Sequence, residues 1–530
     1  MKWLDRFVFP RGELLNFLMI AGLSGVISFW LTGRQIYRAS WGLIDDHEIF
    51  DFLGPDLHLS PNEIWSTMMT KTEIGTLQGR FRPAYYLIKL TETSLFGADV
   101  HLWYLANTVG FAIFLASIWW FMRRFVGIWL AGAFTFYISL LRLWVGVWSR
   151  LGPSEIGGAT CIGVMLFATY FMLFASSSRA RNLNAIILAL ATVALIGMKE
   201  TFIPLAGGTF AVFVLAGIRK NLSLPVITVL SLLVIGGIGG VAVVVEKQVL
   251  VSNTDYYAKS IETWQVLRYA IVGYLVALLR TSWLFLVLIL FFKMFHVIPR
   301  KSLRGWITDS GIALGAYIFL VVTYALQCAL YRSSFPLHSR YDFPAMLLVP
   351  LSACILACYA LYAVRPYFPE QKLERAQFAS AAALFLLTLG SAYFSNAPSL
   401  TSAVQTNIEM TNAFYGELQL ALRAAAQSPE SPVILEAYGP GAYEPVFSLS
   451  RYLPVLGARN RISVRLHPDT TSQGKLYDGL QQGLSNLEAA GAGVLVPLRD
   501  SLANHPEGCI SISINGSPDP GCVGFQVKTL

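Results

Sequence analysis

The amino-acid sequence predicts a polytopic α-helical membrane protein with about eleven transmembrane helices and a C-terminal extracytoplasmic α/β domain. Hydrophobic residues make up 55% of the chain and charged residues only 13%, and the mean hydropathy is +0.56. Its apolar runs of roughly 17 to 25 residues match the thickness of a bilayer core. Cationic pairs such as Arg123-Arg124 and Arg219-Lys220 follow alternate runs, which places these turns in the cytoplasm. The net charge of +8 thus reflects topology, and no nucleic-acid partner is expected.

The predicted transmembrane domain covers residues 1–393. Its first apolar run follows several cations and has no obvious small-residue cleavage site, so we expect a retained span with a cytoplasmic N-terminus. Residues 264–299 are interpreted as one span plus a short re-entrant or interfacial helix. The spans are expected near 14–32, 101–122, 126–147, 156–176, 183–198, 203–217, 223–244, within 264–299, and near 307–328, 343–364 and 377–393.

Two segments are expected on the non-cytoplasmic side: a first external loop at 33–100 and a tail at 394–530. The tail alternates helical and strand-like patterns, as a soluble α/β domain does. Cys509 and Cys522 flank a turn-rich segment and would form a disulfide in an oxidising compartment. Helices are expected near 404–427, 441–452 and 474–490, and strands near 432–436, 493–497 and 509–514.

Polar residues gather in the turns that this topology places outside. The first loop opens with Asp45-Asp46-His47-Glu48. Cations at the outer face run against the usual excess of Lys and Arg in cytoplasmic loops. Charges at membrane depth are also costly, so these cations are expected to have a specific partner. A guanidinium fits phosphate oxygens. The candidates to hold an anion are Arg80, Arg82, Arg150, Lys199, Arg280 and Arg340.

A carboxylate beside a lipid phosphate indicates one reaction in particular. If a sugar is linked to that phosphate, cations neutralise the leaving group while an aspartate removes the proton of an acceptor hydroxyl. The product of such a step is a glycoside. No nucleotide-binding glycine-rich loop is visible in the chain.

Several motifs together resemble the GT-C glycosyltransferases, which are integral membrane enzymes that use polyprenyl-phosphate sugars. The resemblance covers roughly residues 10 to 390, and the tail matches only as an external appendage. It is carried by the order and common side of the acidic pair, Gly79-Arg80-Phe81-Arg82-Pro83, Arg150-Leu151-Gly152-Pro153-Ser154-Glu155, Lys199-Glu200, Asp255-Tyr256-Tyr257 and Arg340-Tyr341.

This resemblance implies roles for individual residues. The catalytic base would be Asp45, with Asp46 the nearest competitor, and the donor phosphate would be held by Arg80, Arg82, Lys199, Arg280 and Arg340. The family includes metal-dependent and metal-independent members, so a divalent cation stays open as the only cofactor considered. The residues assigned to substrate binding are His47, Glu48, Arg150, Glu155, Glu200, Tyr256, Tyr257 and Tyr341.

Each of these sites also has a structural interpretation. The acidic cluster can cap a helix, Arg80 and Arg82 can extend to lipid headgroups, and Glu155 can cap the fourth span. Lys199-Glu200 can form an internal ion pair, and Tyr256-Tyr257 can belong to the interfacial aromatic belt.

Two other functions remain as alternatives. A polymerase or ligase of lipid-linked glycans shares the donor chemistry, although its large external loop is expected late in the chain. A lipid or polysaccharide transporter or flippase is expected to show internal repeats, which this sequence lacks. The favoured function is an inverting glycosyltransferase in the bacterial inner membrane, with its active site on the periplasmic side and a glycan, lipid or protein acceptor.

Overall fold

The computed structural model describes most of the chain before residue 246 and parts of the remainder. These are residues 11–43, 46–54, 56–76, 81–245, 268, 271–272, 275, 322–323, 340, 343–344, 347, 369–394, 399–438, 443–466, 496–497, 509–514, 517–518 and 520–527. Within them, six helices are long and apolar enough to cross a membrane. The protein is therefore an integral membrane protein with a helical membrane part.

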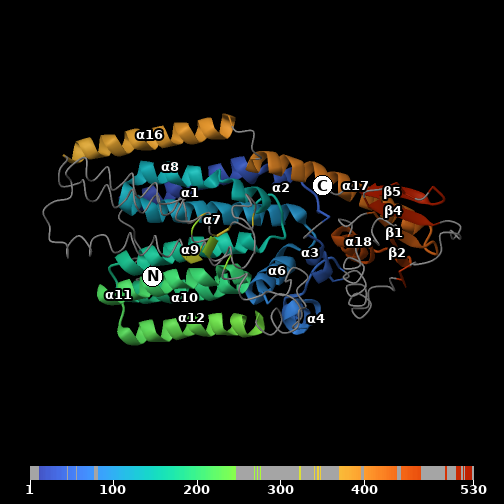
Figure 1. The fold of residues 1–530 in the computed structure, drawn as a ribbon, viewed down its shortest axis with the longest axis horizontal. Coiled ribbons are helices and arrows are strands. Elements are labelled where there is room, and N and C mark those ends of the chain that lie inside the picture. Colours follow the sequence, from blue (N-terminus) through green and yellow to red (C-terminus); the bar gives the residue numbers. More distant parts are fainter. Residues whose placement is uncertain are drawn as a thin grey trace.

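The membrane part is a bundle of helices that run alongside one another (Figure 1). In the described part, α7 packs against α1, α8 and α9, and α10 packs against α9 and α12. The bundle helices are α1 (Arg11–Thr32), α7 (Val100–Val126), α8 (Ile128–Ser139), α9 (Ser154–Phe174), α10 (Ser178–Met198), α11 (Ala206–Ile218), α12 (Leu224–Val245) and α16 (Glu370–Phe394).

Local sequence signals set the ends of these helices. The Asp99 carboxylate accepts a hydrogen bond from the His101 amide at 3.0 Å, which caps the start of α7. That helix ends at Gly127, whose φ of +79° is a conformation that glycine adopts without strain. The Ser177 hydroxyl accepts from the Ala180 amide at 3.0 Å and caps α10 in the same way.

The prediction of one span at 126–147 is wrong. Helix α8 ends at Ser139, and a 3-10 turn, η3 (Arg142–Gly146), follows it. The buried Trp144 indole donates to the Ile138 carbonyl at 2.7 Å, which satisfies an acceptor at the end of α8. The apolar residues of this turn fill the protein interior, and a hydrophobic run alone does not distinguish that interior from lipid.

Five of the other predicted spans are confirmed as α1, α7, α9, α10 and α12. The run at 203–217 is divided between a second 3-10 turn, η4 (Glu200–Leu205), and α11. The apolar part of α16, Gln377–Gly390, is shorter than a full span. The spans predicted within 264–299 and near 307–328 and 343–364 lie almost entirely outside the described residues.

The first loop folds into short helices at one end of the bundle, where α3 and α6 lie between the bundle and the C-terminal sheet (Figure 1). The hydrophobic core is continuous across this junction, because residues of α3, α7 and the sheet belong to one buried cluster. The loop elements are α2 (Arg34–Arg38), α3 (Asp46–Phe52), η2 (Pro61–Glu63), α4 (Ile64–Lys71), α5 (Glu73–Thr76) and α6 (Pro83–Phe96).

The C-terminal region contains a five-stranded parallel sheet in the order β3-β2-β1-β4-β5. The helix α17 (Leu400–Gln427) precedes the sheet, and α18 (Tyr443–Val455) connects its first two strands. In register, Leu435 lies between Val464 and Ile512, and all three are buried. The strands are β1 (Val433–Ala437), β2 (Ile462–Leu466), β3 (Val496–Pro497), β4 (Ile510–Ile514) and β5 (Val523–Val527).

The helices and strands predicted for the tail can be compared with the structure where that part of the chain is described. The helices expected near 404–427 and 441–452 correspond to α17 and α18, and the three expected strands correspond to β1, β3 and β4. The helix expected near 474–490 lies outside the described residues, and β2 and β5 were not predicted. Cys509 and Cys522 form the expected disulfide.

Candidate active site

Asp46, at the start of α3, is a buried carboxylate held by its own turn. Its Oδ2 accepts a hydrogen bond from the Gly42 amide at 2.7 Å. A side chain at Gly42 would place its Cβ 2.9 Å from that oxygen, so a larger residue there would displace the carboxylate. The Gly42 carbonyl in turn accepts from the Tyr452 hydroxyl of α18 at 2.6 Å. Asp46 is therefore bound to the backbone of Gly42 four residues before it, and Asp45 lies outside the described residues.

His47 connects the first loop to α18. Its Nδ1 lies 2.8 Å from Ser448 Oγ, and the same hydroxyl donates to the Leu43 carbonyl. Burial lowers the pKa of His47 well below its usual value, and the positive charge of Arg451 lowers it further. The imidazole is therefore neutral at pH 7 and serves as a hydrogen-bonding link between α3 and α18.

Tyr452 shows how closely the acidic turn and α18 are packed. Burial raises the pKa of Tyr452 well above its usual value, and the negative charge of Asp46 raises it further. The Tyr452 ring lies 4.4 Å from that of Phe50 and 5.5 Å from that of Phe414, measured between centroids. The phenol is therefore a fixed hydrogen-bond donor to the Gly42 turn.

Glu48 reaches the turn before α9 through Tyr85 of α6. The Tyr85 hydroxyl lies 2.8 Å from the Gly152 carbonyl and 3.3 Å from Glu48 Oε2. The turn is also held from α7, because the Asn107 amide donates to the Arg150 carbonyl at 3.0 Å. The helix α3, the helix α6 and the turn before α9 thus meet at the Tyr85 hydroxyl.

Glu155 and Lys199 form a buried ion pair between the first turn of α9 and the end of α10. Their Oε1 and Nζ atoms are 2.6 Å apart, and their side chains are 3% and 4% exposed. The positive charge of Arg340 also acts on Glu155. Two cations, Lys199 and Arg340, therefore act on one buried carboxylate.

The segment that carries Arg340 is held by aromatic packing. The Phe343 ring lies 5.3 Å from Trp144 of η3 and 5.4 Å from Phe202 of η4, measured between centroids. The Arg340 backbone adjoins Gly146, where an added Cβ would lie 3.7 Å from the arginine Cβ. The two 3-10 turns thus position this cation.

Arg82 stands at the start of α6, next to the end of α10. A Cβ added at Gly197 would lie 2.9 Å from Ala84 Cβ, so only glycine lets α6 approach the turn that leads to Lys199. The Arg82 and Arg150 side chains are both partly buried. The positive charge of Arg150 and the negative charge of Asp46 both act on Tyr104, which places these two predicted site residues around one phenol.

The structure thus brings together, at one end of the bundle, the predicted residues that it describes. Glu200 begins η4 directly after Lys199, and its side chain is partly buried. In the described part of the chain, no group of three or more His, Cys, Asp or Glu side chains is placed to hold a metal ion. The predicted residues that lie outside the described ranges are Asp45, Arg80, Arg280, Tyr256, Tyr257 and Tyr341.

Sequence reasoning missed the groups that hold these residues in place. Tyr85 comes two residues after the arginine-containing motif that ends at Pro83, but its residue type alone does not indicate a bridging role. Ser448 and Tyr452 are some 400 residues from the acidic turn, and no local signal connects them to it.

Comparison with known proteins gave matches among solved structures alone, because no family model and no curated protein matches this chain. ArnT from Cupriavidus metallidurans bound to undecaprenyl phosphate matches with 14% identity over 92% of this chain and 90% of that chain, at a TM-score of 0.40. The apo state of ArnT matches with 17% identity over 92% and 89%, also at 0.40.

A third match is the Archaeoglobus fulgidus oligosaccharyltransferase in complex with Zn and sulfate, with 12% identity and a TM-score of 0.36. It covers 84% of this chain but only 62% of that chain. At these identities and TM-scores, the matches assign no role to any residue of this protein.

Proposed function

We propose that this protein is an inverting glycosyltransferase that moves a sugar from a polyprenyl-phosphate-linked donor to an extracytoplasmic glycan, lipid or protein acceptor. The observation that carries the proposal is the meeting of buried charges at one end of the membrane bundle. Lys199 and Arg340 approach Glu155 there, beside the acidic turn at the start of α3. Buried cations at membrane depth suit a lipid phosphate that reaches the site from the bilayer.

In the proposed step, the cations bind the donor phosphate and the acidic turn supplies the base. Asp45 removes the proton of the acceptor hydroxyl as its oxygen attacks the anomeric carbon of the sugar. The bond between that carbon and the phosphate oxygen breaks, and its electron pair stays on the phosphate. Lys199, Arg340 and Arg82 stabilise the resulting negative charge. A single displacement of this kind inverts the anomeric configuration.

The geometry supports different roles for the two aspartates. The Asp46 carboxylate is bound to the Gly42 amide and buried beneath Tyr452, which suits a positioning residue. Asp45, its neighbour in the chain, is then the base. Glu155 forms an ion pair with Lys199, and we assign it the role of positioning that ammonium for the phosphate.

The proposal includes an orientation in the membrane. The N-terminus is assigned to the cytoplasm of a bacterium, and the first loop and the C-terminal α/β domain to the periplasmic side of the inner membrane. The disulfide between Cys509 and Cys522 supports this orientation, because such bonds persist in oxidising compartments.

The proposal is tested by comparing envelope glycans by mass spectrometry in cells that carry the wild-type protein or Asp45→Asn. We expect one sugar modification to disappear, because the amide cannot accept the acceptor proton. Asp56→Asn is the matched control, since Asp56 is an exposed carboxylate of the same loop, and we expect it to leave all glycans unchanged.

Two results would contradict the proposal. A stable Asp45→Asn protein with every glycan intact would remove Asp45 as the base. A product that retains the donor's anomeric configuration, determined by NMR of the purified glycan, would exclude the single displacement.

A further inference from the structure

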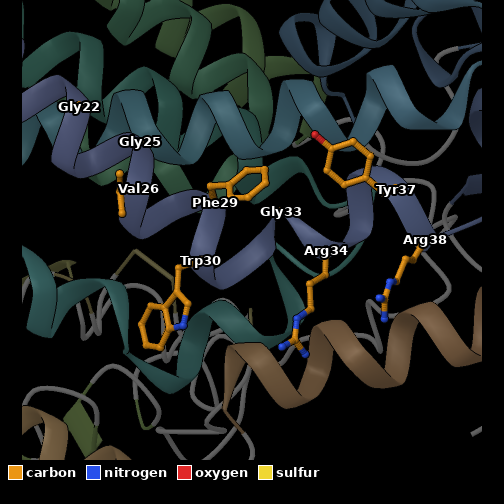
Figure 2. A pocket seen from close by; sticks show the side chains of 9 residues that line it. All are labelled: Gly22, Gly25, Val26, Phe29, Trp30, Gly33, Arg34, Tyr37 and Arg38. Atoms are coloured by element: carbon orange, nitrogen blue, oxygen red, sulfur yellow. The ribbon is translucent and has the colours of Figure 1, made fainter.

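The helix α1 has two different faces. One face packs on α7 through Ser28, whose hydroxyl donates to the Thr108 carbonyl at 2.6 Å, and through Thr32, whose hydroxyl lies 3.0 Å from that of Thr108. The opposite face forms an open groove of about 890 Å³ that continues onto α2 (Figure 2). The residues that line it are Gly22, Gly25, Val26, Phe29, Trp30, Gly33, Arg34, Tyr37 and Arg38.

The inner part of this α1/α2 groove is apolar and open. A Cβ added at Gly22 or Gly25 would meet no atom within 4 Å, so these glycines leave a recess along the helix. Phe29 and Trp30 border it with side chains that are 51% and 53% exposed. Because α1 is a candidate transmembrane span, we expect this recess to be accessible to acyl chains of the bilayer.

The outer end of the groove carries two cations. Arg34 and Arg38 are exposed, and Figure 2 shows their side chains extending from the same side of α2. No ion pair or hydrogen bond of either guanidinium group occurs among the residues that the structure describes. Arg34 comes two residues after the candidate span ends at Thr32, so both cations stand at the depth of lipid headgroups.

We propose that the α1/α2 groove binds one anionic phospholipid of the bilayer. Its phosphate lies between Arg34 and Arg38, and an acyl chain follows the recess past Gly25 and Gly22. The twelve-residue distance from Gly22 to Arg34 corresponds to about 18 Å along a helix, which is close to the depth of one leaflet, about 15 Å. The groove therefore fits a lipid of a single leaflet, and its paired cations complement an anionic headgroup.

This site is separate from the candidate active site. The groove is built by α1 and α2, which pack against α7, α8 and α17. In the candidate active site, Asp46 lies on α3 and Glu155 on α9, and Lys199 stands between α10 and η4. A lipid in the groove is therefore a bound component of the membrane and takes no part in the proposed sugar transfer.

Native mass spectrometry of the full-length protein, released from nanodiscs of equal phosphatidylglycerol and phosphatidylcholine, tests the proposal. We expect wild type to retain one phosphatidylglycerol in preference to phosphatidylcholine. Arg34→Gln/Arg38→Gln should lower that preference about thirtyfold, since the two cations together contribute roughly 2 kcal/mol toward an anionic lipid near a membrane surface. Arg179→Gln/Arg219→Gln removes two other exposed cations of the bundle and should leave it unchanged.

A variant that fills the groove tests how much the apolar recess contributes to lipid binding while both arginines are kept. Gly25→Leu should reduce retention of phosphatidylglycerol while the protein keeps its melting temperature, because an added side chain there meets open space. The proposal is overturned if wild type shows no preference, if both arginine pairs have equal effects, or if Gly25→Leu binds lipid as wild type does. It is also overturned if added undecaprenyl phosphate displaces phosphatidylglycerol at a lower concentration than phosphatidylglycerol itself requires.

Discussion

Cations occur in two contrasting settings in this protein. Lys199 is buried between α9 and α10 and bonded to Glu155 at 2.6 Å, whereas Arg34 and Arg38 are exposed at the end of α1. A buried ammonium pays a large desolvation cost that only a well-placed carboxylate offsets, so its position is fixed by the fold. An exposed guanidinium keeps its hydration and stays available to a lipid. We therefore expect burial to distinguish the cations of the proposed active site from those proposed to bind a lipid headgroup.

The largest expected effect comes from removing the buried cation. Lys199→Ala leaves the Glu155 carboxylate buried without its ammonium, and we expect the free energy of unfolding to fall by about 3 to 5 kcal/mol. Denaturant unfolding of the purified protein in detergent measures this loss. Glu155→Leu/Lys199→Met removes both charges and should cost clearly less, and an equal cost in both variants would contradict the role of the buried pair.

The next effect tests the hydrogen bonds that join the first loop to the turn before α9. Tyr85→Phe keeps the ring but removes the hydroxyl that bonds the Gly152 carbonyl and Glu48. We expect a loss of about 1 to 3 kcal/mol, because buried acceptors are left unsatisfied. Tyr37→Phe is the control, since Tyr37 is 73% exposed, and its unfolding curve should match that of wild type.

A smaller effect is expected from pH. The folded-state pKa of His47 is lowered, so below roughly pH 6.5, the usual histidine value, the unfolded chain binds a proton that the folded protein does not. Stability contributed by His47 should therefore be lost as pH falls from 7.5 to 5.5, by at most about 1.4 kcal/mol per pH unit. His47→Gln should be less sensitive to pH over this window, and identical pH dependence in the two proteins would show that His47 is not buried in neutral form.

The smallest effect belongs to the exposed cations. Arg34→Gln/Arg38→Gln should unfold as wild type does in an uncharged detergent, because these side chains lose no partner that the structure describes. A thermal melt in dodecyl maltoside measures this directly. A large loss of stability would mean that the two arginines are held as Lys199 is, and the contrast between the two settings would fail.

Much of the candidate site could be predicted from the sequence because charged residues in an apolar chain are conspicuous. Glu155, Lys199 and Arg340 were singled out by their predicted side of the membrane, and the structure brings them together. The apolar run at 126–147 was misjudged because hydropathy does not report whether a residue meets lipid or the protein interior. Its second half is the η3 turn, with Trp144 fully buried.

By itself, the sequence determined the class of protein and the positions of most spans in the first half. It also identified the charged residues in the turns between those spans. The physical reason is that the bilayer imposes length and polarity on each segment separately. Only the tertiary structure decided how the acidic turn is held, since Tyr452 and Ser448 reach it from some 400 residues away. It also decided that Glu155 pairs with Lys199 while Arg34 and Arg38 stay exposed. Partners are set by the packing of separate elements, and a one-dimensional pattern contains no distance between them.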